Sequence, residues 1–111
     1  MKASERKHIL RIATGFTKGM LGKGKPNGMC FAVSTALQCY LMFCGYESEL
    51  KECEIDTGNA VSNHFYLQFK EGTILDATAS QFNEILGLEM PLIYLGNKPD
   101  YYLELTNKEL K

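Results

Sequence analysis

The sequence predicts an α+β fold in which two N-terminal helices pack on an antiparallel β-sheet. Apolar residues recur at helical spacing through much of residues 5–43. Apolar and polar residues then alternate over residues 61–69, which is typical of a half-buried strand. A short loop that ends at Gly72 leads to a second apolar run, as in a β-hairpin. These three observations place the helices first and the sheet after them.

The composition is that of one ordinary globular domain. The chain has 111 residues, of which 45% are hydrophobic and 23% charged, so we expect a single domain over residues 1–111. The formal net charge is −1, which lacks the positive footprint of a nucleic-acid-binding protein. The charged N-terminus has no apolar signal-peptide region, and the uncharged run 26–46 is too polar for a membrane helix. We therefore expect a cytoplasmic protein that binds neither nucleic acid nor membrane.

Two helices are expected in the first half of the chain. The first covers roughly residues 5–21, although two internal glycines weaken its second half. The loop 22–28 is rich in glycine and lysine but lacks the full phosphate-binding pattern. The second helix runs over about residues 29–43 and is apolar nearly all round. We therefore expect this helix to be buried on most sides, with Cys39 and Cys44 as small core residues.

Strands dominate the second half of the chain. We expect them over residues 46–55, 61–69, 73–78, 91–95 and 101–105. The first carries many charges, which suits an exposed sheet edge. A short helical turn is expected within residues 79–88, and a frayed tail at 108–111.

The hairpin loop determines which side chains share a face of the sheet. A three-residue loop over residues 70–72 places Phe69 opposite Thr73. In this register His64 and Asp76 lie on the same face as diagonal neighbours, within reach of a side-chain hydrogen bond. A two-residue loop would shift the pairing by one residue and move Asp76 to the other face.

Cys30 stands where the second helix begins, and it is the candidate nucleophile. The free N–H groups and the dipole of a helix N-terminus favour a thiolate. The imidazole of His64 titrates near neutral pH and suits a general base, and Asp76 suits the group that orients it. The backbone N–H of Cys30 is the first candidate donor to an oxyanion. Among side-chain amides Asn27 is the nearest in sequence, and the weaker candidates are Asn63 and Gln81.

Cysteine spacing gives no indication of a metal or cofactor. The four cysteines form no C-x-x-C pair, and both histidines lie far from them in sequence. Three of the four share one predicted helix, where the geometry of a disulfide is rarely met. We therefore expect free thiols in a reducing compartment, and neither metal nor organic cofactor.

Each candidate residue also has a simpler interpretation. Cys30 is then a buried helix cysteine, His64 a strand histidine whose ring is satisfied, and Asp76 a turn residue. Under that interpretation the chain is a non-catalytic protein-binding domain. A redox-sensing thiol is a third alternative, and it requires a second cysteine close to Cys30.

The same residues resemble the transglutaminase-like branch of the papain-like thiol enzymes. The resemblance spans roughly residues 27–82, and its specific part is the order and spacing of several short blocks. The blocks are GMCFAVS at 28–34, CGYESEL at 44–50, HFYLQF at 64–69, GTILDAT at 72–78 and ASQF at 79–82.

The resemblance implies a papain-like fold with Cys30 as nucleophile, His64 as base and Asp76 as orienting acid. It also implies a thiol enzyme that cleaves or transfers an acyl group at an amide of a protein or peptide substrate. Peptidase, deamidase and transglutaminase-like chemistry all stay open. Two departures from the family stand out. Gly24 occupies the position of papain's oxyanion glutamine, six residues before the cysteine, and the chain has no Trp.

Overall fold

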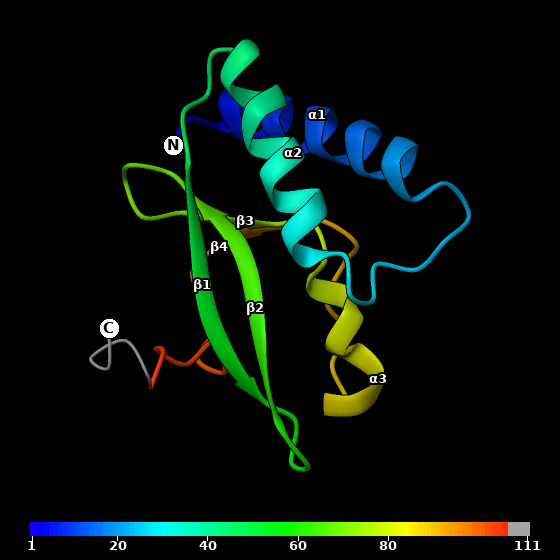
Figure 1. Ribbon diagram of the computed structural model, residues 1–111. Coiled ribbons are helices and arrows are strands. Elements are labelled where there is room, and N and C mark those ends of the chain that lie inside the picture. Colours follow the sequence, from blue (N-terminus) through cyan, green and yellow to red (C-terminus); the bar gives the residue numbers. More distant parts are fainter. Residues whose placement is uncertain (107–111) are drawn as a thin grey trace.

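Two helices cover one face of a four-stranded antiparallel sheet (Figure 1). The computed structural model describes residues 1–106. In chain order the elements are α1 (Ala3–Leu21), α2 (Cys30–Phe43), β1 (Glu49–Asp56), β2 (Val61–Gln68), β3 (Ile74–Asp76), η1 (Ala79–Phe82), α3 (Asn83–Leu86) and β4 (Tyr94–Gly96). The strands lie in the order β1-β2-β3-β4. The expected α+β class and the expected edge position of β1 are thus confirmed.

The sheet has a hydrophobic cluster on each face. On the first face, α1 and α2 pack apolar side chains such as Ile9 and Leu37 against Leu67 of β2. On the second face, Cys53 and Tyr66 pack with Tyr102, which comes from the C-terminal segment. Because side chains alternate along a strand, Leu67 and Tyr66 serve opposite clusters. The side chain of His64, two residues from Tyr66, therefore belongs to the second face.

The β2–β3 hairpin has the expected three-residue loop. The Phe69 N–H donates to the Thr73 carbonyl at 2.9 Å, and Leu67 pairs with Leu75. Gly72 adopts a φ of +106°, a conformation that residues with a side chain rarely adopt. The predicted register is therefore confirmed, but β3 is shorter than the expected strand 73–78 and ends at Asp76.

Helix α1 does not weaken at its internal glycines. It is continuous from Ala3 to Leu21, because Ile9, Ala13 and Thr17 are buried along one side throughout its length. Burial of that side outweighs the low helix propensity of glycine, which costs about 1 kcal/mol per residue.

Helix α2 has the expected bounds, but it is not buried on most sides. Val33, Leu37 and Leu41 face the sheet and are fully buried, whereas Phe43 is 85% exposed. The expectation that Cys39 is a core residue is wrong, since its side chain is exposed, and Cys44 is only partly buried. A 14-residue helix that packs on one sheet face and on α1 leaves its remaining side open, whatever residues occupy it.

The C-terminal part forms less sheet than expected. Of the expected strand 91–95 only Tyr94 and Leu95 are paired, within β4 (Tyr94–Gly96), which pairs with β3. The expected strand 101–105 is reduced to one bridge between Leu103 and Glu54 of β1. A turn from Pro99 to Tyr102 breaks the extended backbone here, with Tyr102 N–H donating to the Pro99 carbonyl at 3.1 Å. The tail expected at 108–111 lies outside the described residues.

Within residues 1–106, no helix has both the length and the apolar character needed to cross a bilayer.

Replacing a buried residue of α2 tests this packing against a matched exposed position. We expect Leu37→Ala to lower the free energy of unfolding by about 2–5 kcal/mol, because it leaves a cavity between α2 and the sheet. We expect Phe43→Ala, in the same helix, to change it by less than about 0.5 kcal/mol. Urea unfolding measures both. Equal losses in the two variants would contradict the placement of α2.

Candidate active site

Cys30 is the first residue of α2, and the chain before it turns sharply. Gly28 has a φ of +75°, which lets the loop enter the helix at Met29 without strain. Cys30 is partly exposed, so its sulfur faces both the protein and solvent. The first N–H groups of the 14-residue helix have no partner within the helix, and the helix dipole adds a partial positive charge near the sulfur.

The sheet opens where this helix begins. Pairing between β2 and β3 stops at Leu67 and Leu75, so the backbone of Phe65 has no strand partner on that side. The N-terminal turns of α2 take that place. Ser34 Oγ donates to the Phe65 carbonyl at 3.3 Å, and the Phe65 backbone lowers the pKa of the Cys30 thiol. The opening in the sheet thus positions the sulfur.

His64 and Asp76 form a fully buried pair beside Cys30. Neither side chain is exposed, and His64 Nε2 lies 2.5 Å from Asp76 Oδ2. The pair joins β2 to the end of β3 across the opening in the sheet. The predicted diagonal contact between these side chains is therefore present.

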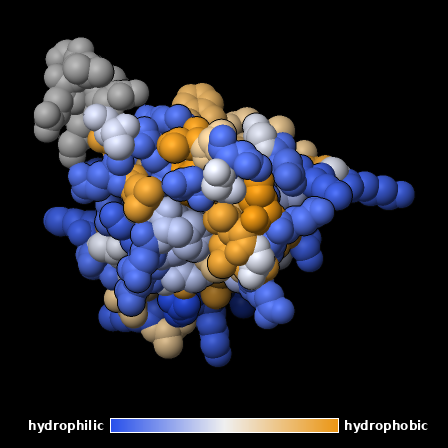
Figure 2. Space-filling view, turned by 90° about the horizontal axis from the view of Figure 1, so that it is seen from below, coloured by the Kyte–Doolittle hydropathy of each residue, from blue (hydrophilic) through white to orange (hydrophobic). Residues whose placement is uncertain are grey.

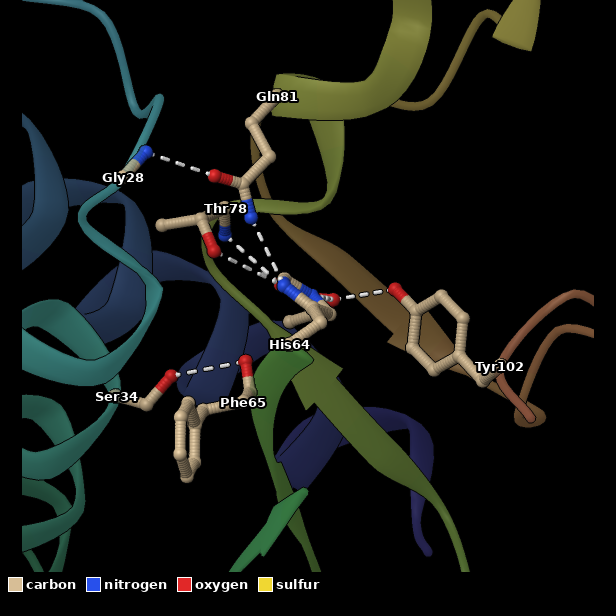
Figure 3. Close-up of polar contacts among 8 residues, drawn as sticks. Gly28, Ser34, His64, Phe65, Thr78, Gln81 and Tyr102 are labelled. Carbon is tan, nitrogen blue, oxygen red and sulfur yellow. Dashed lines mark hydrogen bonds and ion pairs between the residues drawn. The ribbon is translucent and has the colours of Figure 1, made fainter. Parts of the chain in front are cut away.

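Three further donors hold the Asp76 carboxylate in place. The Thr78 N–H donates to Oδ1 at 2.9 Å, and the Thr78 hydroxyl lies 3.4 Å from the same oxygen. The Tyr102 hydroxyl donates to Oδ2, beside His64 (Figure 3). Burial and the nearby carboxylate raise the Tyr102 pKa, so this hydroxyl keeps its proton.

Tyr102 is a site residue that sequence reasoning missed. The sequence predicts it only as part of a strand, and none of the residues adjacent to it in sequence indicates a polar role. The tertiary packing of the C-terminal segment brings it to Asp76.

The electrostatics favour a thiolate at Cys30 paired with a protonated His64. Burial raises the pKa of the Cys30 thiol, but hydrogen bonds from His64 and Phe65 and the His64 charge outweigh it, so the pKa is lowered. Burial lowers the pKa of His64, yet the hydrogen bonds to Asp76 and Cys30 raise it to about 9. A thiol with a lowered pKa beside an imidazole with a raised one can act as nucleophile and proton donor.

A cleft of about 630 Å³ opens over Cys30. Residues from the α2 entrance, the β1–β2 turn and the η1–α3 segment line it: Asn27, Gly28, Cys30, Thr57, Ser62, Asn63, Gln81, Phe82, Glu84 and Ile85. Figure 2 shows the molecule from below, the side on which the β1–β2 turn lies in Figure 1, with a hydrophobic area near its centre and hydrophilic side chains around it. Cys30 thus lines the cleft, whereas His64 and Asp76 are buried and do not line it.

The three candidate oxyanion amides have different surroundings. Asn27 lines the cleft, as does Asn63, whose Nδ2 donates to Glu52 Oε2 at 2.7 Å. Gln81 lowers the pKa of the Cys30 thiol, and its Nε2 lies 2.8 Å from His64 Nδ1. Proximity in sequence favoured Asn27, whereas contact with the sulfur favours Gln81, which η1 supplies from far along the chain.

The remaining cysteines do not share the environment of Cys30. All four thiols are free, as expected. Cys53 lies opposite His64 on β1, and burial and the Asp76 charge raise its pKa to about 12. Such a thiol is inert near neutral pH. Among residues 1–106, no group of three or more His, Cys, Asp or Glu side chains could hold a metal ion.

In comparisons with protein-family models, curated proteins and solved structures, no match to this chain was found. The interpretation of the site therefore rests on its own geometry and on the resemblance of its sequence blocks.

Thiol alkylation across pH tests the contact between Cys30 and His64. We expect iodoacetamide to modify Cys30 with a midpoint below the ordinary thiol value of about 8.5. His64→Ala removes the hydrogen bond and the positive charge, so the midpoint should rise. Peptide mass spectrometry separates Cys30 from the exposed Cys39, which serves as an internal reference. His8→Ala, which removes the other histidine, should leave the midpoint unchanged, and an equal effect of both variants would contradict the assignment.

Removing the Tyr102 hydroxyl tests the support of Asp76. We expect Tyr102→Phe to lower the free energy of unfolding by about 1.5–3 kcal/mol, the usual range for a hydrogen bond to a charged group. Tyr94→Phe is the matched control, because its hydroxyl donates to the Asn97 carbonyl at the surface and should matter less. Chemical denaturation of both variants makes the comparison, and a smaller loss in Tyr102→Phe would contradict it.

Proposed function

We propose that this chain is a thiol enzyme that cleaves or transfers an acyl group through a thioester on Cys30. One observation carries the proposal. A partly exposed Cys30 lines a cleft, a buried His64 lowers the pKa of its thiol, and His64 is hydrogen-bonded to a buried Asp76. The resemblance to the transglutaminase-like branch of papain-like enzymes supports the same proposal, and a papain-like fold is part of it.

The first half of the reaction forms the thioester. The Cys30 thiolate attacks the carbonyl carbon of an amide, forming a carbon–sulfur bond and placing a negative charge on the carbonyl oxygen. The Cys30 N–H and the Gln81 side chain are suitable donors to that oxygen. When the oxyanion collapses, the carbon–nitrogen bond breaks, and the amine leaves with the proton from His64 Nδ1.

The second half releases the acyl group. Water or a second amine enters the cleft and gives a proton to the now neutral His64 as it attacks the thioester carbon. The new carbon–oxygen or carbon–nitrogen bond forms, the carbon–sulfur bond breaks, and the thiolate–imidazolium pair is restored. Asp76 keeps the imidazole oriented through Nε2 in both halves.

The cleft suits a side chain or a short peptide segment. Its volume of about 630 Å³ lies within the usual range of ligand sites. Amide or hydroxyl side chains belong to half of its lining residues, and Phe82 and Ile85 add apolar surface. We therefore propose a peptide or a glutamine side chain as substrate. We also propose that the enzyme is cytoplasmic.

Trapping the acyl intermediate tests this function. We expect p-nitrophenyl acetate to release p-nitrophenol and to leave an acetyl group on Cys30, detectable by intact and peptide mass spectrometry. Cys30→Ala should lose both signals, whereas Cys39→Ala should keep them. Glutamine peptides with added methylamine then separate hydrolysis, which releases ammonia and leaves a carboxylate, from transfer, which yields a methylamide. Absence of a Cys30 adduct in a folded protein would favour the non-catalytic binding domain.

The pH profile supplies an independent check. Activity should rise on the acidic side as the Cys30 thiolate forms, below the ordinary thiol pKa. It should fall on the alkaline side near pH 9, where His64 loses the proton that the leaving group needs. Asp76→Asn removes the negative partner of His64, so the alkaline limb should move to lower pH. An alkaline limb that does not move in this variant would contradict the role of His64.

A further inference from the structure

The side chain of Gln81 connects parts of the site that come from three elements. Its Oε1 accepts from the Gly28 N–H at 3.0 Å, just before α2. Its Nε2 lies 2.8 Å from His64 Nδ1, and the same side chain lowers the pKa of the Cys30 thiol, as a donor beside the sulfur does. Figure 3 shows the Gln81 amide extending from the η1 segment between Gly28 and His64.

Gly28 fixes which way this amide faces. A backbone N–H only donates, so the Gln81 atom that faces it must be the oxygen. The NH₂ group then faces His64 Nδ1 and also only donates, so Nδ1 must present its lone pair. The proton of the imidazole is on Nε2, toward Asp76. This arrangement therefore belongs to a neutral His64.

The thiolate–imidazolium form of the site needs a different arrangement. In that form Nδ1 carries a proton, which would point at the Gln81 NH₂ group, and two donors cannot bond to each other. The amide must then leave Nδ1. Its other neighbour is the Cys30 sulfur, which becomes an acceptor in the same step.

We infer that Gln81 exchanges hydrogen-bond partners with the protonation of His64, donating to Nδ1 of the neutral ring and to Cys30 or a substrate oxygen when the ring is charged. The inference rests on the proposed function for its catalytic consequence. When the thiolate forms, the Gln81 NH₂ group leaves Nδ1 and becomes free to donate to the substrate oxygen that carries the negative charge. Gln81 is then a catalytic residue as well as a hydrogen-bond partner of His64.

The other groups around His64 do not carry this exchange. Asp76 from β3 contacts Nε2, on the opposite side of the ring from Gln81. Cys53 from β1 has a pKa raised to about 12, and the Tyr102 hydroxyl from the C-terminal segment also has a raised pKa, so neither titrates with His64. Cys30 is the remaining partner, and its charge changes together with that of His64.

Nitrogen NMR of the histidine rings tests the inference without any substrate. The chain has two histidines, so His8→Gln assigns the signals. In a Cys30→Ala background no thiolate accepts from Gln81, so its bond to Nδ1 stabilises only the neutral ring. In that background Gln81→Leu removes the bond, and the His64 midpoint should rise by about one unit, the effect of one hydrogen bond. Gln81→Glu accepts from both Gly28 and a protonated Nδ1, so the midpoint should rise further.

The side-chain amide signals of Gln81 give a direct readout of the exchange. They should shift with the same midpoint as His64, whereas those of Gln68, whose amide donates to the Gly72 carbonyl, should not. Gln68→Leu is the matched control variant and should leave the His64 midpoint unchanged. In the Cys30→Ala background, a His64 midpoint that is unchanged or lower in folded Gln81→Leu overturns the inference.

Turnover separates this inference from the proposed function. Gln81→Leu and Gln81→Glu should both lower kcat about 100-fold to 1,000-fold, since neither can donate to an oxyanion. If kcat falls while Gln81→Leu leaves the His64 midpoint of the Cys30→Ala background unchanged, Gln81 is an ordinary oxyanion donor and the exchange is wrong. If the His64 midpoints follow the predicted order but neither the wild type nor any variant forms an acyl group on Cys30, the exchange stands and the proposed function is wrong.

Discussion

The buried contact between His64 and Asp76 sets the conditions that the rest of the site must meet. Removing two titratable side chains from water is costly unless each of their polar atoms finds a partner. The Asp76 carboxylate therefore accepts hydrogen bonds from the Thr78 backbone and the Tyr102 hydroxyl in addition to its contact with the imidazole. Tyr102 belongs to a segment that makes only one bridge to the sheet, so this contact helps hold that segment in place. The opposite nitrogen, Nδ1, is left to face Gln81 and the helix that carries the thiol.

The position of that helix follows from the same strands. Beyond Leu67 and Leu75 the β2–β3 ladder stops, and the free backbone of Phe65 needs new partners. Ser34 and Cys30 supply them from consecutive turns at the start of α2. An unpaired strand segment and an uncapped helix N-terminus thus satisfy each other, and the sulfur is fixed beside the imidazole without a dedicated loop.

The parts of this arrangement that depend on local sequence rules could be predicted from the sequence. The three-residue loop ending at Gly72 determines the hairpin register, and the register alone brings His64 and Asp76 to one face. The start of α2 at Cys30 follows from the glycine-containing loop before it and the apolar run after it. Other features depend on tertiary packing. The exposure of Cys39 depends on how much of α2 its neighbours cover, and the approach of Tyr102 depends on how the C-terminal segment folds back.

Gln81 shows why nearness in sequence is a poor guide to an oxyanion donor. Asn27 is three residues from Cys30, yet a residue just before a helix can point its side chain in many directions. Gln81 lies far along the chain, but η1 follows β3 directly, and Asp76 binds the Thr78 backbone that leads into η1. The carboxylate that orients His64 thus also fixes the segment from which Gln81 reaches the sulfur. In this chain, orientation of the base and placement of the amide donor depend on the same short stretch, residues 76–81.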